Sequence, residues 1–185
     1  MAALYNILLF IGTLFFSFCV FIVLLRICLQ FFRVNVNNPI CVLAAKTTNP
    51  FVLPLKKLLP RVHNVDLAAV LLLFIIECLK FSFFAWIEHV FIGFAWLALI
   101  SFTDMLIQVI DLLFYSIIIR VILSWIGSLN NSNNGLNDVL YAFTEPLLGR
   151  IRRFLPVIAG FDLSPMVAFI ILKVIEIIVV SYLPH

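Results

Sequence analysis

The sequence predicts an all-α membrane protein with four transmembrane helices, built from two tandem repeats of a helix, a basic amphipathic segment and a second helix. Of the 185 residues, 65% are hydrophobic and 11% are charged, whereas a soluble domain carries about 25% charged residues. So few polar residues cannot cover a soluble surface, which makes lipid the main solvent of the chain. Two further observations support this fold class: long apolar runs and an internal repeat.

Four apolar runs predict membrane spans near residues 4–29, 66–87, 98–126 and 163–183, because a span needs about 20 apolar residues. The first run lacks a positive leading region and is too long for a signal peptide, so we expect it to stay as a helix. Residues 88–127 also allow two alternatives to one pass: two short passes, or a re-entrant hairpin followed by one pass.

The internal repeat aligns residues 48–68 with residues 144–164, and residues 24–31 with residues 118–125. The second copy therefore has two extra loop residues in its Asn-rich turn. This alignment predicts a first repeat over residues 1–97 and a second over residues 98–185. The matched positions are Thr48 with Thr144, Pro50 with Pro146, Lys56-Lys57 with Arg152-Arg153, Pro60 with Pro156, and Asp66 with Asp162.

The basic residues predict the orientation of the chain. They gather in the two segments between the spans of each repeat, and with four spans both segments lie on one side. The positive-inside rule places that side in the cytoplasm, so we expect both termini on the opposite side, which for the inner membrane of a Gram-negative bacterium is the periplasm. Because the clusters alternate with apolar runs, anionic lipid head groups are the expected counter-charge and nucleic acid is not an expected partner.

Each basic segment resembles a short helix that starts at Thr48-Asn49-Pro50 or at Thr144-Glu145-Pro146 and lies in the interface. Pro54 should distort the first of these helices. One interpretation is a packed loop with orienting charges. The other is a surface for anionic lipid or a protein partner, made of Lys56, Lys57, Arg150, Arg152 and Arg153.

Charged residues inside the spans predict a network. Asp66, Glu77 and Lys80 share one face of the second span, at about 100° per residue. In the fourth span, Asp162, Lys173 and Glu176 do the same with the order of acid and base exchanged. Glu77 could face Lys173 and Lys80 could face Glu176 across the repeats, or each helix could hold its own i,i+3 pair. In both cases we expect the charged stripe to face the bundle interior.

Three further charges complete the candidate site. Arg26 and Arg120 end the first and third spans at the level where Asp66 and Asp162 begin the second and fourth, which predicts Arg–Asp clasps within or across repeats. Asp111 lies deeper, roughly 13 Å from Arg120 along the helix axis, on a face shared with Asp104 and Gln108. Its matched position is Ser17, so Asp111 is either a functional acid or a third partner for Lys80 or Lys173.

Catalytic and cofactor signatures are absent from the sequence. There is no GxSxG, HExxH or Gly-rich phosphate loop. The four cysteines have no CxxC spacing, and no histidine lies near them in sequence. We therefore expect no enzyme activity, no cofactor, no metal and no disulfide.

The repeat residues resemble a known family. TEPLLGRIRRFLP followed by GFDLSP looks like the C-terminal motif of the YggT family, also called YlmG, and TNPFVLPLKKLLP with VDLA is similar to its degenerate first copy. Ala68-Ala69 replaces Ser164-Pro165 in that copy. The resemblance implies an integral membrane protein of the kind found in bacteria and plastids. It also implies links to osmotic-shock tolerance, ion homeostasis, cell-division gene clusters, nucleoid distribution and cytochrome assembly.

Two functions follow as expectations. The first is support of osmotic-stress tolerance or ion homeostasis, directly or as an accessory to transport, carried by the intramembrane charges. The second is a membrane scaffold or assembly factor for cell division or membrane complexes, carried by the basic segments. Because four helices make a narrow bundle, a transport role predicts a homo-oligomer or a membrane-protein partner.

Overall fold

The protein is all-helical over the residues that its computed structural model describes, which are 2–57, 59, 65–126, 135–154 and 162–181. Its helices are α1 (Ala2–Phe31), α2 (Pro39–Leu55), α3 (Leu67–Ile87), α4 (Phe94–Trp125), α5 (Gly135–Arg152) and α6 (Ser164–Ser181). The described residues contain no strand. The predicted all-α class is therefore confirmed.

Four of these helices are long and apolar enough to cross a membrane: Leu4–Phe31, Leu67–Ile87, Phe94–Trp125 and Ser164–Ser181. This number confirms the four-span prediction. α4 is one continuous helix of 32 residues, so the stretch after residue 88 makes one pass and neither two short passes nor a re-entrant hairpin. At 1.5 Å per residue α4 is about 48 Å long, which exceeds a hydrocarbon core of about 30 Å.

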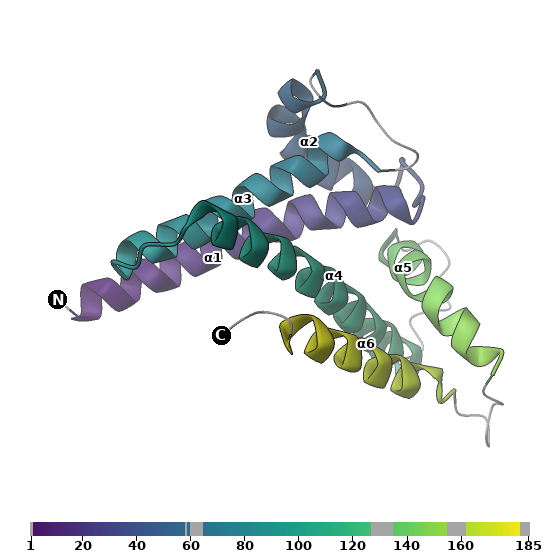
Figure 1. Ribbon diagram of the computed structural model, residues 1–185. Coiled ribbons are helices and arrows are strands. Elements are labelled where there is room, and N and C mark those ends of the chain that lie inside the picture. Colours follow the sequence, from purple (N-terminus) through teal and green to yellow (C-terminus); the bar gives the residue numbers. More distant parts are fainter. Residues whose placement is uncertain (1, 58, 60–64, 127–134, 155–161, 182–185) are drawn as a thin grey trace.

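The spans form two antiparallel pairs. α1 packs against α3, α4 packs against α6, and the α3–α4 contact joins the pairs. Figure 1 shows the pairs diverging toward the end of the molecule that carries α2 and α5. Aromatic rings hold the first pair at the opposite end, where the Phe16 and Phe83 ring centroids lie 5.6 Å apart.

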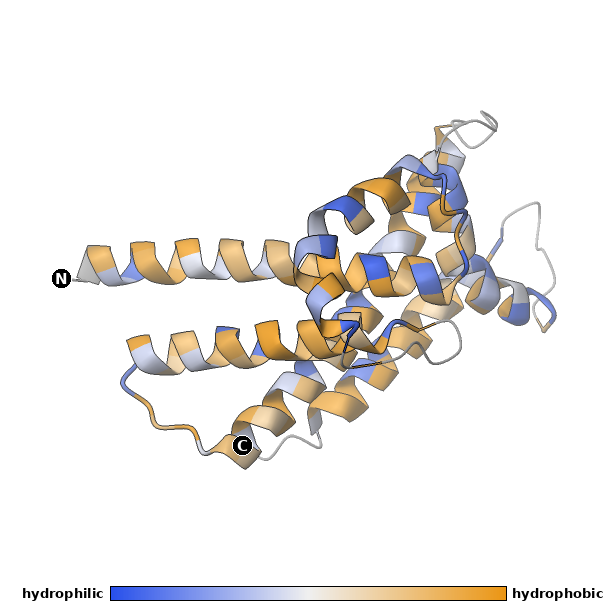
Figure 2. Ribbon diagram, turned by 90° about the horizontal axis from the view of Figure 1, so that it is seen from above, coloured by the Kyte–Doolittle hydropathy of each residue, from blue (hydrophilic) through white to orange (hydrophobic). Residues whose placement is uncertain are grey.

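Two hydrophobic clusters form the core. One joins α1, α2 and α3 and includes Phe143 from α5, whose ring lies 5.2 Å from that of Phe32. The other joins α4, α5 and α6 around the buried Ile117, Leu148 and Leu172. The outward faces of the spans are mostly hydrophobic, and hydrophilic residues gather at the ends of the helices (Figure 2). This surface fits a lipid solvent.

The predicted starts of the two basic helices are wrong. α2 begins at Pro39, where the Asn38 side chain accepts a hydrogen bond from the Ile40 amide at 2.9 Å. α5 begins at Gly135. The Thr-X-Pro sequences lie inside both helices, because the upstream residues also bury one side of each helix and extend it. Thr48 and Thr144 are therefore buried helical residues and not caps.

Pro50 and Pro54 lie inside α2, and Pro146 lies inside α5. Pro54 does not stop α2, which continues to Leu55. The first turns of α2 and α5 meet, since Asn38 Nδ2 donates to the Gly135 carbonyl at 2.7 Å. This bond joins the two halves of the chain at the end that carries the basic residues.

Candidate functional site

A four-residue polar cluster lies between α3 and α4. Lys80 Nζ is 2.5 Å from both Glu77 Oε2 and Asp104 Oδ2. Gln108 Nε2 donates to Glu77 Oε1 at 2.7 Å and to Asp104 Oδ2 at 2.6 Å. The Glu77 side chain is 0% exposed. Burial at this depth requires paired charges, and Lys80 supplies the pairing.

Helical spacing places these side chains opposite one another. Glu77 and Lys80 are three residues apart on α3, and Asp104 and Gln108 are four residues apart on α4, so each pair lies on one face of its helix. The antiparallel contact of α3 with α4 then brings both faces together. The sequence places Asp104 and Gln108 on the face of Asp111, but their pairing with Lys80 was missed.

The charged pair of α6 is separate from this cluster. Lys173 Nζ is 2.5 Å from Glu176 Oε2 and lies 4.9 Å from the centroid of the Phe114 ring. The i,i+3 alternative is thus the arrangement present, and pairing of Glu77 with Lys173 or of Lys80 with Glu176 is not. The reason is packing: α6 lies against α4 and α5, whereas α3 lies against α1 and α4.

The predicted inward orientation of the whole stripe is also wrong. It holds for Glu77, but the Lys173 side chain is 46% exposed and that of Glu176 is 23% exposed. The described helices therefore leave the Lys173–Glu176 face of α6 partly open.

Asp111 lies between the two charged pairs. It is half-buried and within electrostatic range of Lys173, Glu176 and Asp104. It also lines a cleft of about 720 Å³ between α1, α4 and α5, which we call the central cleft. The cleft is mostly apolar, and its polar lining consists of Ser17, Lys80, Gln108, Asp111, Tyr115 and Ser116.

Carboxylates outnumber lysines inside the spans. Glu77, Asp104, Asp111 and Glu176 share the spans with Lys80 and Lys173, and with Arg26 and Arg120, which bind Asp66 and Glu145 at the end of the spans that adjoins α2 and α5. Away from that end, four carboxylates meet two lysines, at a depth where each remaining charge costs about 2.5–3.5 kcal/mol or more. An acid in that position is stabilised by a proton or by a bound cation.

The first clasp forms within the first half of the chain. Arg26 Nη2 lies 3.7 Å from Asp66 Oδ2, and both side chains are almost fully buried, at 5% and 1% exposed. Arg26 Nη1 also donates to Thr48 Oγ1 at 2.5 Å and to Asn49 Oδ1 at 2.9 Å. Lys56 Nζ reaches the same Asp66 oxygen at 2.8 Å. Arg26 thus ties α1 to α2 and to the start of α3.

The second clasp differs from the prediction. Arg120 Nη2 pairs with Glu145 Oε2 at 2.8 Å and Nη1 donates to Thr144 Oγ1 at 2.5 Å. Asp162 pairs with Arg152, at 2.8 Å, and Arg152 also lies 3.2 Å from Glu145. A direct Arg120–Asp162 pair is replaced because Glu145 supplies a closer carboxylate. Thr48, Asn49, Thr144 and Glu145 are members of the clasps that sequence reasoning missed.

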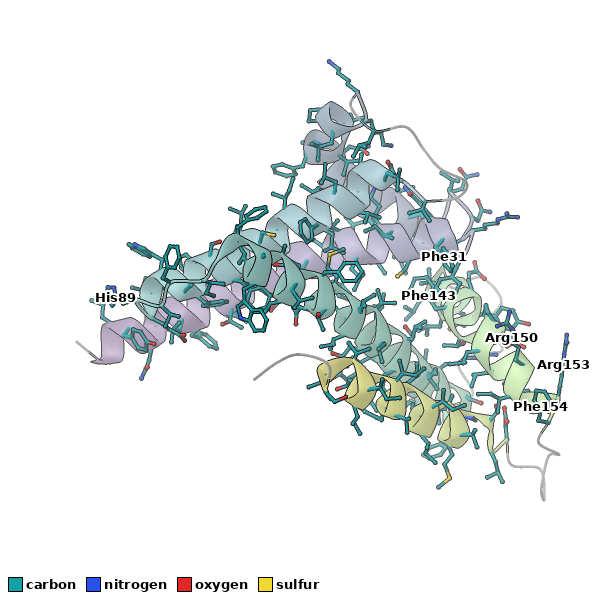
Figure 3. All side chains as sticks on the ribbon, in the orientation of Figure 1. Phe31, His89, Phe143, Arg150, Arg153 and Phe154 are labelled. Atoms are coloured by element: carbon teal, nitrogen blue, oxygen red, sulfur yellow. The ribbon has the colours of Figure 1, made fainter. Side chains whose placement is uncertain are left out.

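The five predicted surface basics fall into two groups. Lys56 and Arg152 are bound to Asp66 and Asp162, so they belong to the clasps. Lys57, Arg150 and Arg153 are exposed. Figure 3 shows Arg150 and Arg153 beside Phe154 at the outer end of α5.

Burial raises the pKa of Asp162, but hydrogen bonds from Ser164 and Arg152 outweigh it and hold that pKa below its usual value.

Fold and site together define a multi-pass membrane protein whose spans carry an acidic polar network. Residues 5–87 and residues 96–183 each match the family CCB3/YggT, and the chain belongs to this family. No solved structure matches the chain.

Three relatives illustrate the membership. The chain is 38% identical to an uncharacterized protein of Haemophilus influenzae, over 89% of this chain and 86% of that protein. It is 36% identical to an uncharacterized protein in the proC 3' region of Vibrio alginolyticus, over 86% of this chain and 85% of that protein. It is 30% identical to the uncharacterized protein YggT of Escherichia coli K12, over 84% of this chain and 79% of that protein.

Proposed function

We propose that this protein is a non-enzymatic inner-membrane protein that supports ion homeostasis, and through it osmotic-stress tolerance, directly or as an accessory to a transport system. The observation that carries the proposal is that, away from the end that holds Arg26 and Arg120, the spans carry four carboxylates against two lysines. Acidic residues at that depth are found where protons or cations are handled.

Asp111 is the residue we assign to ion exchange. Glu77 and Asp104 share Lys80 at 2.5 Å each, and Glu176 holds Lys173 at the same distance. Asp111 borders the central cleft together with Lys80 and Gln108. A proton or small cation in the cleft would meet Asp111 first and the Asp104–Gln108 pair next along the same face of α4.

A second copy of the chain is the partner we propose for this role. Lys173 and Glu176 lie near the middle of α6 and are partly exposed. Charges in that position normally face a bundle interior or a water-filled cavity, and a homo-oligomer would provide one. Exposed basics such as Lys57 and Arg153 would meet anionic head groups at the cytoplasmic surface.

The proposal predicts an ion flux that depends on Asp111. Purified protein in liposomes should pass protons or a monovalent cation above the level of empty liposomes. Asp111→Asn keeps the size of the side chain and removes its charge, so the flux should fall to that of empty liposomes. Asp138→Asn is the control, because Asp138 is an exposed acid on α5 outside the spans. Equal flux in both variants would contradict the assignment.

A scaffold for cell division or membrane-complex assembly is the second candidate. The exposed end of α5 favours it, since Phe154 is 86% exposed beside two arginines. Growth under hyperosmotic conditions, in a strain without its own copy, separates the two functions. Failure of Asp111→Asn alone indicates ion handling. Failure only of Lys57, Arg150 and Arg153 changed together to Gln indicates a scaffold.

A further inference from the structure

The central cleft has two unlike walls. Its α4 wall presents Gln108, Asp111 and Tyr115, whose spacing of three and four residues places them on one face of the helix. The positions of α1 that the repeat alignment matches to Asp111 and Tyr115 are Ser17 and Phe21, and both of these also line the cleft. The α4 wall is therefore acidic and able to form hydrogen bonds, whereas the α1 wall is nearly apolar.

The cleft is larger and more apolar than a site for a bare ion. Its volume is about 720 Å³, and α5 lines it with Val139, Leu140 and Phe143. An inorganic cation is held by a shell of several oxygen ligands, and most of this lining is hydrocarbon. An occupant that fills the cleft therefore needs an apolar body as well as a charge.

The charges around the cleft favour a cation as that occupant. Asp111 is half-buried and lines the cleft. Both lysines of the spans are bound to other carboxylates at 2.5 Å. A cation in the cleft would give Asp111 the direct counter-charge that an acid at this depth requires.

Gln108 adds an acceptor that calls for a donor. Its amide nitrogen donates to Glu77 Oε1 at 2.7 Å and to Asp104 Oδ2 at 2.6 Å, and these two carboxylates fix the orientation of the amide group. Its Oε1 atom is buried and accepts no hydrogen bond from the residues that the structure describes. Leaving a buried acceptor without a donor costs free energy. A ligand with N–H groups would supply that donor on the same face of α4 as Asp111.

We propose that the central cleft binds an amphipathic primary ammonium ion, with its charged end at Asp111 and Gln108 and its apolar body against α1 and α5. The ammonium group donates hydrogen bonds to the Asp111 carboxylate and to Gln108 Oε1. The rings of Phe21 and Tyr115 contact the cation and the carbon atoms next to it. The inference rests on the proposed function, because Asp111 exchanges a cation in both, and it names that cation as an organic one.

The test is isothermal titration calorimetry of the purified full-length protein in detergent, with phenethylammonium chloride as the probe and empty micelles as the reference. Saturable binding is expected. Phenethyl alcohol keeps the apolar body without the charge and should bind about tenfold more weakly or worse. The trimethylated ammonium keeps the charge without the N–H donors and should also bind more weakly. Equal binding of the probe and the alcohol, or displacement of the probe by an equal concentration of potassium, would overturn the proposal.

Two pairs of variants locate the site. Asp111→Asn should weaken binding of the probe by about tenfold or more, whereas Asp138→Asn, on the exposed side of α5 outside the cleft, should leave it within about twofold. Ser17→Phe fills the cleft from an exposed position of α1 without changing a charge, so it should also weaken binding. Thr13→Phe adds the same ring one turn away, outside the cleft, and should not. Ser17→Phe decides the matter if Asp111→Asn lowers the amount of folded protein.

Binding and ion flux are separate measurements, so the two proposals can fail separately. Flux that depends on Asp111, without binding of the probe, would contradict this inference and leave the proposed function standing. Binding of the probe by a protein that passes no ion through liposomes would support this inference and contradict a direct role in ion transport. Unchanged binding in both Asp111→Asn and Ser17→Phe, or equal loss in their controls, would overturn the inference.

Discussion

At the scale of single residues, one amide and one carboxylate decide how two matched arginines are held. Arg26 donates a hydrogen bond to the Asn49 side chain and forms an ion pair with Asp66, at 3.7 Å. Arg120 forms its ion pair with Glu145, at 2.8 Å. Asp162 is consequently left to Arg152. The clasp predicted from Arg and Asp spacing is thus present in one half and redistributed over four residues in the other.

The Arg152–Asp162 pair predicts a pH-dependent stability. The folded pKa of Asp162 lies below its usual value, so the pair stabilises the fold above the unfolded pKa of about 4 and stops doing so as pH falls through the folded pKa. Asp162→Asn should therefore lower the free energy of unfolding by about 0.2–1 kcal/mol at pH 7. The difference should shrink as the pH falls through the folded pKa of Asp162.

Thermal unfolding in detergent, followed by circular dichroism at several pH values, measures this difference. Each comparison with Asp162→Asn is made at one pH, so the titration of other acids cancels. A destabilisation that does not shrink as the pH is lowered further and further below about 4 would mean that the ion pair is not its cause.

At the scale of elements, the close approach of α1 and α3 depends on a glycine. A methyl group at Gly12 would lie 2.5 Å from Phe83 Cε1, which is shorter than any ordinary contact. The Phe83 ring is also packed against Phe16 and Phe84. The ring therefore has little room to move, and the helices must separate to accept a larger residue.

We predict that Gly12→Ala weakens the first helix pair. Overpacking of this kind costs about 1–3 kcal/mol, and the midpoint of denaturation should fall accordingly. Gly93→Ala is the matched control, because a methyl group there meets nothing within 4 Å. Stability that falls equally in both variants would trace the effect to the backbone and not to the contact with Phe83.

At the scale of the whole molecule, two diverging helix pairs place the residues of the candidate site. The pairs diverge toward α2 and α5 (Figure 1). The central cleft lined by Asp111 lies between α1, α4 and α5, and the Lys173–Glu176 pair is partly exposed. The same arrangement places α2 and α5 at one end, joined through Asn38 and Gly135. The basic residues of both helices therefore lie at one end of the molecule.

This arrangement predicts the topology of the chain. A reporter fused after His185 should read periplasmic, and one inserted at Asn131 should read cytoplasmic, because basic loops are retained on the cytoplasmic side. Paired alkaline phosphatase and fluorescent-protein fusions at both sites provide the measurement. The reverse pattern would overturn the predicted orientation.

The sequence by itself determined the fold class and the four spans. Apolar runs of span length leave few alternatives in lipid, where every backbone polar group needs an internal partner. It also placed Arg26 and Asp66 at one level, since both lie where a span meets a basic segment. The tandem repeat stays a prediction made from its matched residues.

Only the tertiary structure decided which charges meet. Residue spacing fixes the face of a helix but not the helix that packs against it, so Lys80 could have faced Glu176 and instead binds Asp104. The sequence also left the starts of α2 and α5 undetermined, because a Thr-X-Pro sequence fits a helix start and also a helix interior when upstream residues are buried. Packing between segments that are distant in sequence determined both the charge partners and the helix starts. The periodicity of a single segment carries no information about that packing.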